Sequence, residues 1–357
     1  MNLGIILALG DSFKNMAKSG QDSFFKKFYL SAFSKEFEKV IIFSYENEQV
    51  LGLPHNVRVI PNKYNLHRFI YAILLPLLNL KIILECNILR VYHLFGIPPA
   101  IIAKLFFGKP FIFNYAYDYE KIAKIEAKRL NYFLLIFLKP IAFYFASKIF
   151  VANKQLMKKV NVQKSVFLSN GTDVNFFKPL KSTNPENSLK LLSVGRLEKQ
   201  KNFENLIMAL KGLKVQLIIV GQGSLKDELL KIAKINEVKM TIIPRVENRG
   251  MPKLYNQADI FVLPSYIEGS PKVLLEAMSC GLPVLGSDAE GIDEVLNGTN
   301  GRKCGTSSKS ISEAVNYLIK NPGFRVQAGK EARKFIVNNF NLEVLLKKEI
   351  KIIKEAS

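Results

Sequence analysis

The stretch Asp259–Asp288, DIFVLPSYIEGSPKVLLEAMSCGLPVLGSD, decides the fold of this chain. DIFVLPS is a short apolar run bounded by turn residues, which predicts a buried strand, and PVLGS begins a second strand after Gly281. Between them, Ser270 suits an N-cap and Pro271 suits the first helical position, where its missing N–H costs nothing. The stretch therefore predicts a strand, a turn, a helix and a second strand in succession.

The start of that helix is expected to bind an anion such as a phosphate. The first N–H groups of a helix have no partner within it, and the helix dipole places a partial positive charge there. Glu268 lies in the turn before the helix and Glu276 lies inside it, so both could reach hydroxyl groups of a ligand held at the helix start. The alternative, an ordinary surface pair of glutamates, is weakened by the neighbouring anion site.

The rest of the C-terminal half repeats the same unit. Apolar runs at 189–195, 215–223 and 238–244 are predicted strands, and segments with helical periodicity alternate with them. This alternation indicates a parallel, doubly wound sheet. Ligands bind beyond the carboxyl ends of the strands in such sheets, so the segments that follow the strands are expected to form one site. These segments contain Gly195, Arg196, Gly221, Gly223, Arg245, Val246, Gly269, Ser270, Pro271 and Lys272.

Two cations flank the loop GRLEKQKN at residues 195–202. Arg196 and Lys201 suit a diphosphate because they can neutralise a leaving group that gains negative charge. The alternative is a solvated lysine-rich loop. The Gly-x-Gly at 221–223 is weak as a dinucleotide fingerprint, since the third glycine and the later acidic residue are missing. It is expected to turn the chain or to let the backbone pass close to a ligand.

The N-terminal half shows the same alternation of predicted strands and helices less clearly. We expect one domain over residues 1–168 and a second over 169–339, joined by SVFLSNGTDVNFFKP with its Asn-Gly turn. A basic amphipathic helix at 340–357 is expected to pack back onto the first domain. Strands of the first domain are predicted at 3–9, 39–43, 87–92, 110–114 and 148–151.

Composition restricts the partners. The 357 residues carry a formal net charge of +21, which favours an anionic partner such as a phosphorylated substrate or an acidic membrane surface, although a lysine-rich surface that is merely solvated fits as well. No helix-turn-helix, aromatic–basic sheet motif or arginine-rich arm indicates nucleic acid. The apolar runs 69–84 and 132–146 contain Pro76 and Pro140 and are too short for membrane spans, so buried or interfacial helices are expected.

Metal and nucleophile chemistry have no sequence signature here. There is no Asp-x-Asp, and the three cysteines have neither zinc nor disulfide spacing, which fits a reducing cytosol. No Ser–His–Asp or Cys–His set is present. Among the three histidines, His93 follows an apolar strand and either faces the ligand site or is a structural histidine.

With these motifs the chain resembles glycosyltransferase family 4, the group 1 retaining glycosyltransferases with the GT-B fold. The resemblance is specific from about residue 165 to 350, and Glu268 and Glu276 match the E-x7-E element of the family. The segments that carry it are SNGTDVNFFKP (169–179), VGRLEKQKNFENLI (194–207), IIVGQGSLKDEL (218–229), EGSPKVLLEAMSCGLPVLGSD (268–288) and GIDEVLNGTNG (291–301).

The resemblance implies an α/β fold of GT-B type, in which two Rossmann-like domains face each other across a cleft. It implies a nucleotide-sugar donor, UDP- or GDP-linked, as co-substrate, with no bound cofactor and no metal. Arg196 and Lys201 would hold the diphosphate, Glu276 would bind the ribose and Glu268 would bind the donor sugar. The catalytic residues would be Arg196, Lys201 and Glu268. Backbone N–H groups from Ser270 to Val273 would complete these contacts, and Arg245-Val246 would line the base.

Two departures from the family lie on the acceptor side. Ala116 stands where the family commonly has a histidine, and Tyr115, Tyr117 or Asp118 is expected to substitute for it, with His93 a further candidate. The Gly-Gly loop after the first strand is reduced to Gly10 and Gly20-Gln21.

The predicted function is therefore retaining, metal-independent sugar transfer to a saccharide or lipid-linked acceptor in cell-surface polysaccharide or glycolipid assembly. The protein is expected in the cytoplasm, with FFKKFYL (24–30) and the region 121–150 placed against an anionic inner membrane surface. Alternatives are a decayed enzyme that binds a nucleotide-sugar or polyanion, and a GT-B nucleotide-sugar epimerase.

Overall fold

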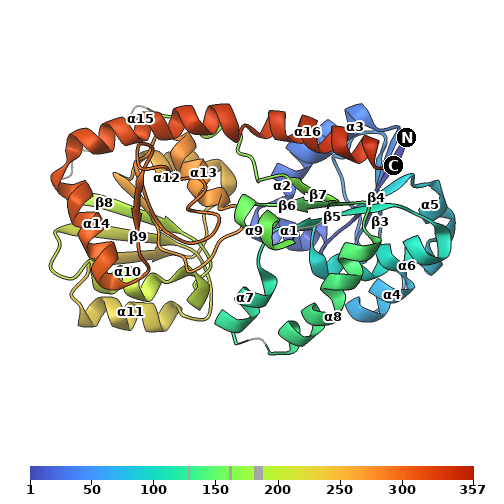
Figure 1. The fold of residues 1–357 in the computed structure, drawn as a ribbon, viewed down its shortest axis with the longest axis horizontal. Helices are drawn as coiled ribbons and strands as arrows, with labels where there is room; N and C mark the ends of the chain where they lie inside the picture. The colour runs from blue at the N-terminus through green and yellow to red at the C-terminus, as the bar shows by residue number, and fades with distance from the viewer. Residues whose placement is uncertain (128, 161–162, 181–187) are drawn as a thin grey trace.

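Two separate parallel sheets, one in each half of the chain, organise the fold (Figure 1). The computed structural model describes residues 1–127, 129–160, 163–180 and 188–357. Each sheet has helices on both faces, because strands buried on both sides need two apolar layers to cover them. The prediction of two doubly wound parallel sheets is confirmed.

The first sheet has seven strands in the order β3-β2-β1-β4-β5-β6-β7, all of them parallel. Ile5 and Ile6, neighbours on the central strand, belong to two different apolar clusters, one on each face of the sheet. The strands are β1 (Asn2–Ile6), β2 (Lys39–Phe43), β3 (Val57–Ile60), β4 (Ile88–Val91), β5 (Phe111–Tyr115), β6 (Lys148–Val151) and β7 (Ser165–Phe167). The helical segments between them are α1 (Phe13–Ser19), α2 (Asp22–Phe24), the π-helix η1 (Phe25–Leu30), α3 (Ser31–Glu36), α4 (Arg68–Leu78), α5 (Leu80–Glu85), η2 (Leu94–Gly96), α6 (Pro98–Phe107), α7 (Tyr119–Ile125), α8 (Arg129–Phe145) and α9 (Lys154–Val160).

The second sheet has six parallel strands in the order β10-β9-β8-β11-β12-β13. Its strands are β8 (Leu189–Val194), β9 (Val215–Val220), β10 (Met240–Ile243), β11 (Ile260–Leu263), β12 (Val284–Ser287) and β13 (Arg302–Cys304). Its helical segments are η3 (Lys199–Lys201), α10 (Phe203–Ala209), α11 (Lys226–Ile235), η4 (Asn248–Gly250), α12 (Met251–Asn256), α13 (Lys272–Ser279), α14 (Ser308–Lys320) and α15 (Pro322–Asn339).

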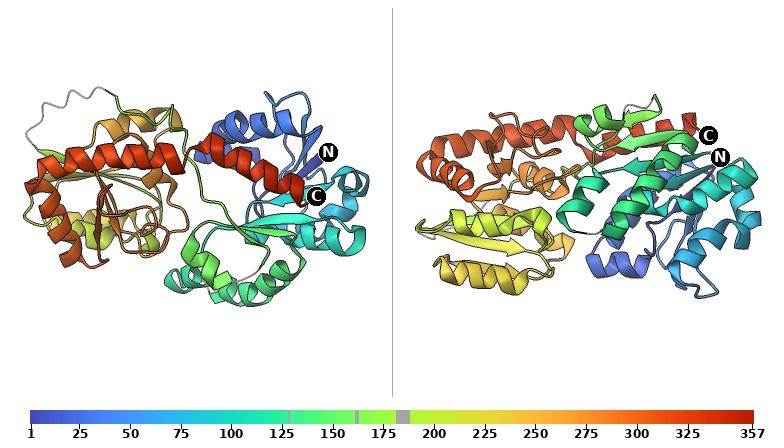
Figure 2. Two further views of the ribbon diagram at one scale, coloured as in Figure 1. Left: turned by 45° about the horizontal axis from the view of Figure 1, so that its top comes forward. Right: turned by 60° about the horizontal axis from the view of Figure 1, so that its bottom comes forward.

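The chain crosses between the domains twice, and the two crossings touch. Thr172 and Asn341 form an isolated parallel bridge, in which the Thr172 N–H bonds to the Phe340 carbonyl at 2.9 Å. After this point α16 (Leu342–Glu355) runs back over the first domain, as both views of Figure 2 show. Ile350 and Ile353 of α16 are buried in a core cluster of the first sheet. The C-terminal helix therefore ties the two domains together.

Short strands were the part of the fold that sequence patterns predicted poorly. The strands β3 and β13 were not predicted, because VRVI and RKC are too short and too polar to show a period. The first strand ends at Ile6, whereas the sequence pattern extended it to Leu9.

Candidate functional site

The site is built where the strand order reverses in each sheet. The order changes between β1 and β4 in the first sheet and between β8 and β11 in the second, and ligands bind at such switch points. The loops after these four strands line one cavity of about 610 Å³ between the domains. Among the predicted site residues, it is lined by Gly195, Arg196, Lys201, Glu268, Ser270, Pro271, Lys272 and Val273 from the second domain, and by His93 and Tyr117 from the first.

Helix α13 points its N-terminus at this cavity. Its first hydrogen bonds run from the N–H groups of Leu274 and Leu275 back to the Pro271 carbonyl, which leaves the N–H groups of Lys272 and Val273 at the open end. The assignment of Ser270 as N-cap was wrong: Pro271 occupies the cap position, without a side-chain hydrogen bond.

The Ser270 hydroxyl is instead used to attach the turn to the inter-domain connector. It lies 2.7 Å from the Ser169 hydroxyl and accepts the Asn170 N–H at 3.0 Å, while the Asn170 amide donates to the Ser270 carbonyl at 2.8 Å. These bonds hold the turn from outside the helix, so the helix end itself stays open to an anion.

Glu268 is a buried residue that lines the cavity, and one of its carboxylate oxygens accepts two hydrogen bonds from the protein. Its Oε1 accepts hydrogen bonds from the Lys201 ammonium at 2.5 Å and from the Ser265 hydroxyl at 2.7 Å. The second carboxylate oxygen is not used by these contacts. A carboxylate held this way by a cation presents a fixed acceptor to a ligand hydroxyl.

Arg196 lies beside this pair, on the loop after β8. Its guanidinium contacts Glu198 at 3.1 Å and donates to the Gln200 amide oxygen at 3.3 Å, and the Arg196 side chain remains well exposed. Lys201 packs its stem against Gly195, where an added Cβ would come within 3.1 Å of the Lys201 Cε. The two cations and the first residues of α13 therefore line the same cavity.

Glu276 lies inside α13 rather than on the cavity wall. Its carboxylate accepts the Tyr255 hydroxyl at 2.9 Å and lies 3.8 Å from Lys272 Nζ. Burial raises the pKa of Glu276, against the opposing effects of Lys272 and Tyr255. A ligand hydroxyl reaches this carboxylate only if the surrounding side chains move.

The glycines of the second domain serve close backbone packing. A Cβ on Gly221 would lie 1.8 Å from the Gly195 carbonyl oxygen, and one on Gly223 would lie 2.4 Å from that of Leu197. The Gly-x-Gly turn thus lets the loops after β8 and β9 lie against each other. Gly269 packs in the same way against the first domain, with its added Cβ 1.8 Å from the Ala116 carbonyl oxygen.

On the first-domain side, His93 and Tyr117 face Glu268 and Arg196 across a second lobe of about 430 Å³. The His93 Nδ1 accepts the Phe95 N–H at 3.2 Å, which places the ring proton on Nε2. Burial lowers the pKa of His93 to about 4, so the ring is neutral near pH 7. Burial also raises the pKa of Tyr117, with a smaller contribution from the Glu268 charge.

Other predicted residues lie away from the cavity wall. Tyr115 is buried in the core of the first domain, and Asp118 caps α7 through the Lys121 N–H at 3.1 Å. Arg245 lies at the rim, where it donates to the Ala17 carbonyl at 2.8 Å. Gly20 lies next to the Arg245 guanidinium across the rim, and Val246 packs against the core of the second domain.

Several polar residues of the site had no signal in the sequence. Asn153, which is buried, follows β6 and donates to the Gly269 carbonyl at 3.0 Å, so the first domain holds the turn before α13. Asp11, Gln21 and Asn114 line the first-domain side of the cavity. Each is a single polar residue in a loop or at a strand end, and only the packing of the domains brings them together.

Comparison with known proteins agrees with this geometry. The sequence pattern of the family described as glycosyl transferases group 1 matches residues 175–335, which contain α13 and the loops around it. The matched segment, a little under half of the chain, is thus similar in sequence to the group 1 glycosyltransferases. The part of the cavity that the match covers is the second-domain side, with Arg196, Lys201 and Glu268.

Individual relatives match this chain only over part of its length. It is 35% identical over 179 residues to an uncharacterised glycosyltransferase of Methanocaldococcus jannaschii, covering 47% of this chain and 45% of the relative. It is 26% identical over 243 residues to the capsular polysaccharide biosynthesis glycosyltransferase CapM of Staphylococcus aureus, covering 61% and 64%. The chain thus spans about half to two thirds of the length of these curated relatives.

The fold of this chain is shared over nearly its whole length with a solved structure. Sucrose-phosphate synthase from Thermosynechococcus elongatus superposes with a TM-score of 0.86 at 16% identity, covering 99% of this chain and 98% of that one. At this identity the likeness shows the two-domain GT-B fold alone.

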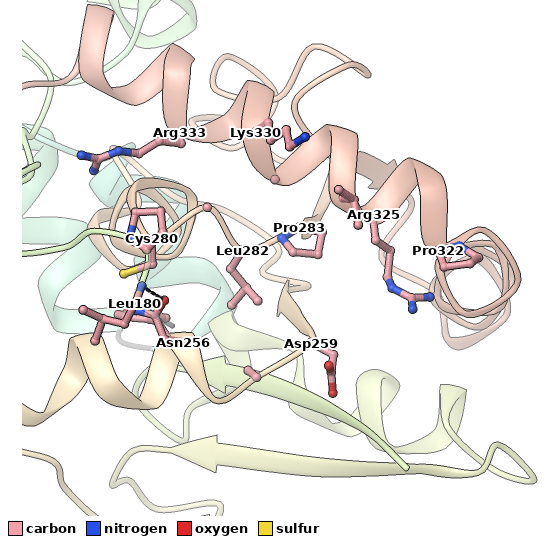
Figure 3. Close-up of a pocket in the computed structure, with 16 residues that line it drawn as sticks. Leu180, Asn256, Asp259, Cys280, Leu282, Pro283, Pro322, Arg325, Lys330 and Arg333 are labelled. Atoms are coloured by element: carbon pink, nitrogen blue, oxygen red, sulfur yellow. Dashed lines mark hydrogen bonds between the residues drawn. The ribbon is translucent and has the colours of Figure 1, made fainter. Parts of the chain in front are cut away.

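A separate cavity of about 640 Å³ lies on the second domain, away from the switch points (Figure 3). Arg325, Lys330 and Arg333 reach toward it from α15. Arg333 already donates to the carbonyls of Phe177 and Ser279 at 2.8 Å, and Arg325 to that of Ile319 at 3.0 Å. Arg325 and Arg333 therefore satisfy backbone carbonyls, and none of the predicted site residues lines this cavity.

Proposed function

We propose that this chain is a retaining, metal-independent glycosyltransferase that moves a sugar from a nucleoside-diphosphate donor to a saccharide or lipid-linked acceptor. One observation carries the proposal. A single cavity at both switch points joins the open N-terminus of α13 to Arg196, Lys201 and the buried carboxylate of Glu268.

The diphosphate is assigned to the space between α13 and the two cations. Backbone N–H groups of Lys272 and Val273 would bind one phosphate, as helix N-termini commonly do. Arg196 and Lys201 would bind the other and stabilise the charge that the diphosphate gains as it leaves. Because these side chains supply the positive charge, we propose that no metal ion and no further cofactor are needed, whether the donor is UDP- or GDP-linked.

The sugars of the donor are assigned to the glutamates. Glu268, at the bottom of the cavity, would accept hydrogen bonds from hydroxyls of the transferred sugar. Glu276 would bind the ribose once Tyr255 or Lys272 releases its carboxylate. Arg245 and Val246, near the rim, would contact the base.

In the proposed reaction, the bond between the anomeric carbon and the diphosphate oxygen breaks while the acceptor hydroxyl bonds to the same face of the sugar. The hydroxyl proton passes to the departing diphosphate oxygen. His93, neutral with its proton on Nε2, would donate a hydrogen bond to the transferred sugar from the first-domain side, where Ala116 has no side chain to do so. Closure of the domains would exclude water and favour transfer over hydrolysis.

The acceptor would enter from the first domain, whose polar side chains line the cavity. The similarity to CapM, a glycosyltransferase of capsular polysaccharide biosynthesis, supports a role in cell-surface polysaccharide or glycolipid assembly. We propose that the protein works in the cytoplasm as a peripheral protein at the inner face of the cell membrane.

The direct test is a thermal-shift screen over UDP- and GDP-sugars, followed by product analysis with the donor that stabilises the protein. We expect stabilisation by one nucleotide class and transfer that continues in excess chelator. NMR of the product should show the same anomeric configuration as the donor. An inverted product, or loss of transfer with chelator that a divalent ion restores, would refute those parts of the proposal.

A second function, binding of a nucleotide-sugar without transfer, is favoured by one observation, the alanine at position 116. Tight nucleotide binding with neither transfer nor donor hydrolysis for any common donor would support it. An epimerase would instead yield an isomer of the donor without any acceptor.

A further inference from the structure

Four helices of the first domain expose an unusual amount of apolar surface. More than half of the large apolar side chains that are exposed in the described residues lie on α4, α5, α6 and α8. Phe106 is 72% exposed and Phe137 is 70% exposed, whereas typical exposed apolar residues are single and scattered. The set consists of Phe69, Ile70, Ile73, Leu77, Leu78, Leu80, Leu84, Leu105, Phe106, Phe133, Leu134, Ile136, Phe137, Ile141 and Tyr144. We call this set the apolar face.

The helices that carry the apolar face are neighbours. α6 packs against both α4 and α8, and α5 follows α4 directly. In Figure 1, α4, α6 and α8 lie at the lower right of the molecule and α5 at its right edge. Each helix also buries residues against the sheet, for example Leu75 on α4, Ala103 on α6 and Leu135 on α8. The helices are thus apolar on two sides, so folding of the domain alone does not explain the outer side.

The charges on these helices are almost all positive. In their residues the one acidic side chain is Glu85, which lies 3.3 Å from Lys39. Arg68, Lys81 and Lys104 lie on the same helices. An apolar surface with basic side chains around it and hardly any acidic ones complements an anionic lipid surface.

We propose that the apolar face docks the protein on a bilayer that contains anionic phospholipids. The apolar side chains would enter the boundary between headgroups and acyl chains, and the basic side chains would bind the headgroup phosphates. Docking from one side fits the finding that none of the helices in the described residues has both the length and the apolarity to cross a bilayer.

This surface differs from the one that the sequence suggested at residues 24–30. Phe24, Phe25 and Tyr29 line the cavity between the domains, so we leave that segment out of the proposed docking surface. Of the region 121–150, α8 does belong to the apolar face.

The position of α8 links the apolar face to the site. Leu135 lines the 430 Å³ lobe together with Arg196, Lys201 and Glu268, while Phe133, Leu134, Ile136 and Phe137 around it are exposed. A lipid-linked acceptor held in the bilayer would therefore reach the donor along α8. This last step rests on the proposed transfer reaction, whereas docking itself rests on the first domain alone.

A second copy of the chain is the competing occupant of the apolar face. Two such faces would bring like charges together around the contact, because both carry basic side chains and one acidic residue each. Charge complementarity therefore favours the anionic bilayer.

Vesicle flotation with the full chain tests the proposal without any donor or acceptor. Vesicles of phosphatidylcholine alone are compared with vesicles in which about a third of the lipid is phosphatidylglycerol. We expect binding to the anionic vesicles at least tenfold tighter, weakened by salt because headgroup charges are screened. The double variant Phe133→Ser/Phe137→Ser should lose at least tenfold in binding, and because both side chains are exposed it should keep the wild-type Tm.

The matched control is Leu230→Ser/Ile235→Ser, which removes two exposed apolar side chains from α11 of the second domain and should bind vesicles as the wild type does. Equal loss in the control would overturn the assignment of the face. A different outcome is a wild type that binds neither kind of vesicle and forms dimers, which are lost in Phe133→Ser/Phe137→Ser. That outcome would show that a second copy of the chain covers the apolar face. Transfer to a soluble acceptor, measured in parallel, reports on the proposed function separately.

Discussion

Lys272 of α13 places its ammonium 3.7 Å from the centroid of the Phe24 ring, across the cleft between the domains. Both side chains line the cavity that we assign to the donor. The cation that borders the open end of α13 is thus covered, in this arrangement, by an aromatic ring of the first domain. A phosphate bound at α13 competes with that ring for the ammonium.

We expect Phe24→Ala to raise the affinity for the free nucleoside diphosphate by about three- to fivefold, since a cation–π contact of this kind is worth about 0.5–1 kcal/mol. Calorimetric titration of the full chain measures it. The matched control is Phe69→Ala, which removes a half-exposed ring that lies 5.2 Å from the Arg68 guanidinium and does not line the cavity. An affinity that falls in Phe24→Ala would mean that the ring contacts the nucleotide instead of competing with it.

Glu268→Gln should reduce transfer by at least about 100-fold, the loss typical when one aligned polar contact to a reacting group is removed. Binding of the free nucleotide should change by less than threefold, because Glu268 is assigned to the transferred sugar. Steady-state kinetics and calorimetry separate these effects. Glu247→Gln, a change in an exposed glutamate outside the cavity, serves as control. Transfer at the wild-type rate in Glu268→Gln would remove Glu268 from the mechanism.

His93 should titrate far below the ordinary range of histidine. Its pKa is lowered to about 4 by burial, so the folded state binds its proton more weakly than the unfolded state does. Between pH 6.5 and 4 the unfolded state takes up the proton first, and the stability of the protein should fall over this window as the pH falls. His93→Gln should flatten the pH dependence of Tm there.

NMR provides the direct measurement on His93. The chain has three histidines, and we expect the His93 ring signal to titrate near pH 4. The signal is assigned by its absence in His93→Gln. A His93 ring that titrates between pH 6 and 7 would contradict its burial in the cleft and its role as a neutral hydrogen-bond donor.

The buried ion pair between Arg90 on β4 and Glu349 on α16 should be a main attachment of the C-terminal helix. The Arg90 Nε lies 2.8 Å from Glu349 Oε1, and its guanidinium lies 4.6 Å from the ring centroids of both Tyr92 and Phe150. We expect Glu349→Ala to cost about 3–5 kcal/mol, because it leaves Arg90 buried without a counter-charge.

Urea unfolding of the full chain measures that cost. The control is Lys354→Ala, which removes an exposed partner of Glu36 and should cost less than about 1 kcal/mol. Equal effects of the two variants would show that the buried pair does not secure α16. A double variant, Arg90→Met/Glu349→Leu, should recover most of the loss, since it removes both charges together.

Much of the second domain could be predicted from its sequence. The stretch from Asp259 to Asp288 forms the predicted strand, turn, helix and strand, and Glu268, Arg196 and Lys201 lie in one cavity. This works because strands, helix ends and turns follow from neighbouring residues, and because a parallel sheet places all its carboxyl ends on one edge.

The local pattern failed where a side chain had two suitable partners. Ser270 has the chemistry of an N-cap, yet its hydroxyl bonds to Ser169 and Asn170, about a hundred residues away. Tertiary partners competed with the local ones and won.

The sequence by itself determined the two sheets, the helix start at α13 and the residue types around it, since each depends on a few consecutive residues. Only the tertiary structure decided that Asn153 holds the turn at Gly269, that Lys272 meets Phe24 and that α16 returns to Arg90. It also decided which side of α4, α6 and α8 stays uncovered. These contacts join residues far apart in the chain and depend on how the domains pack. The periodicity of a local stretch of sequence does not predict that packing.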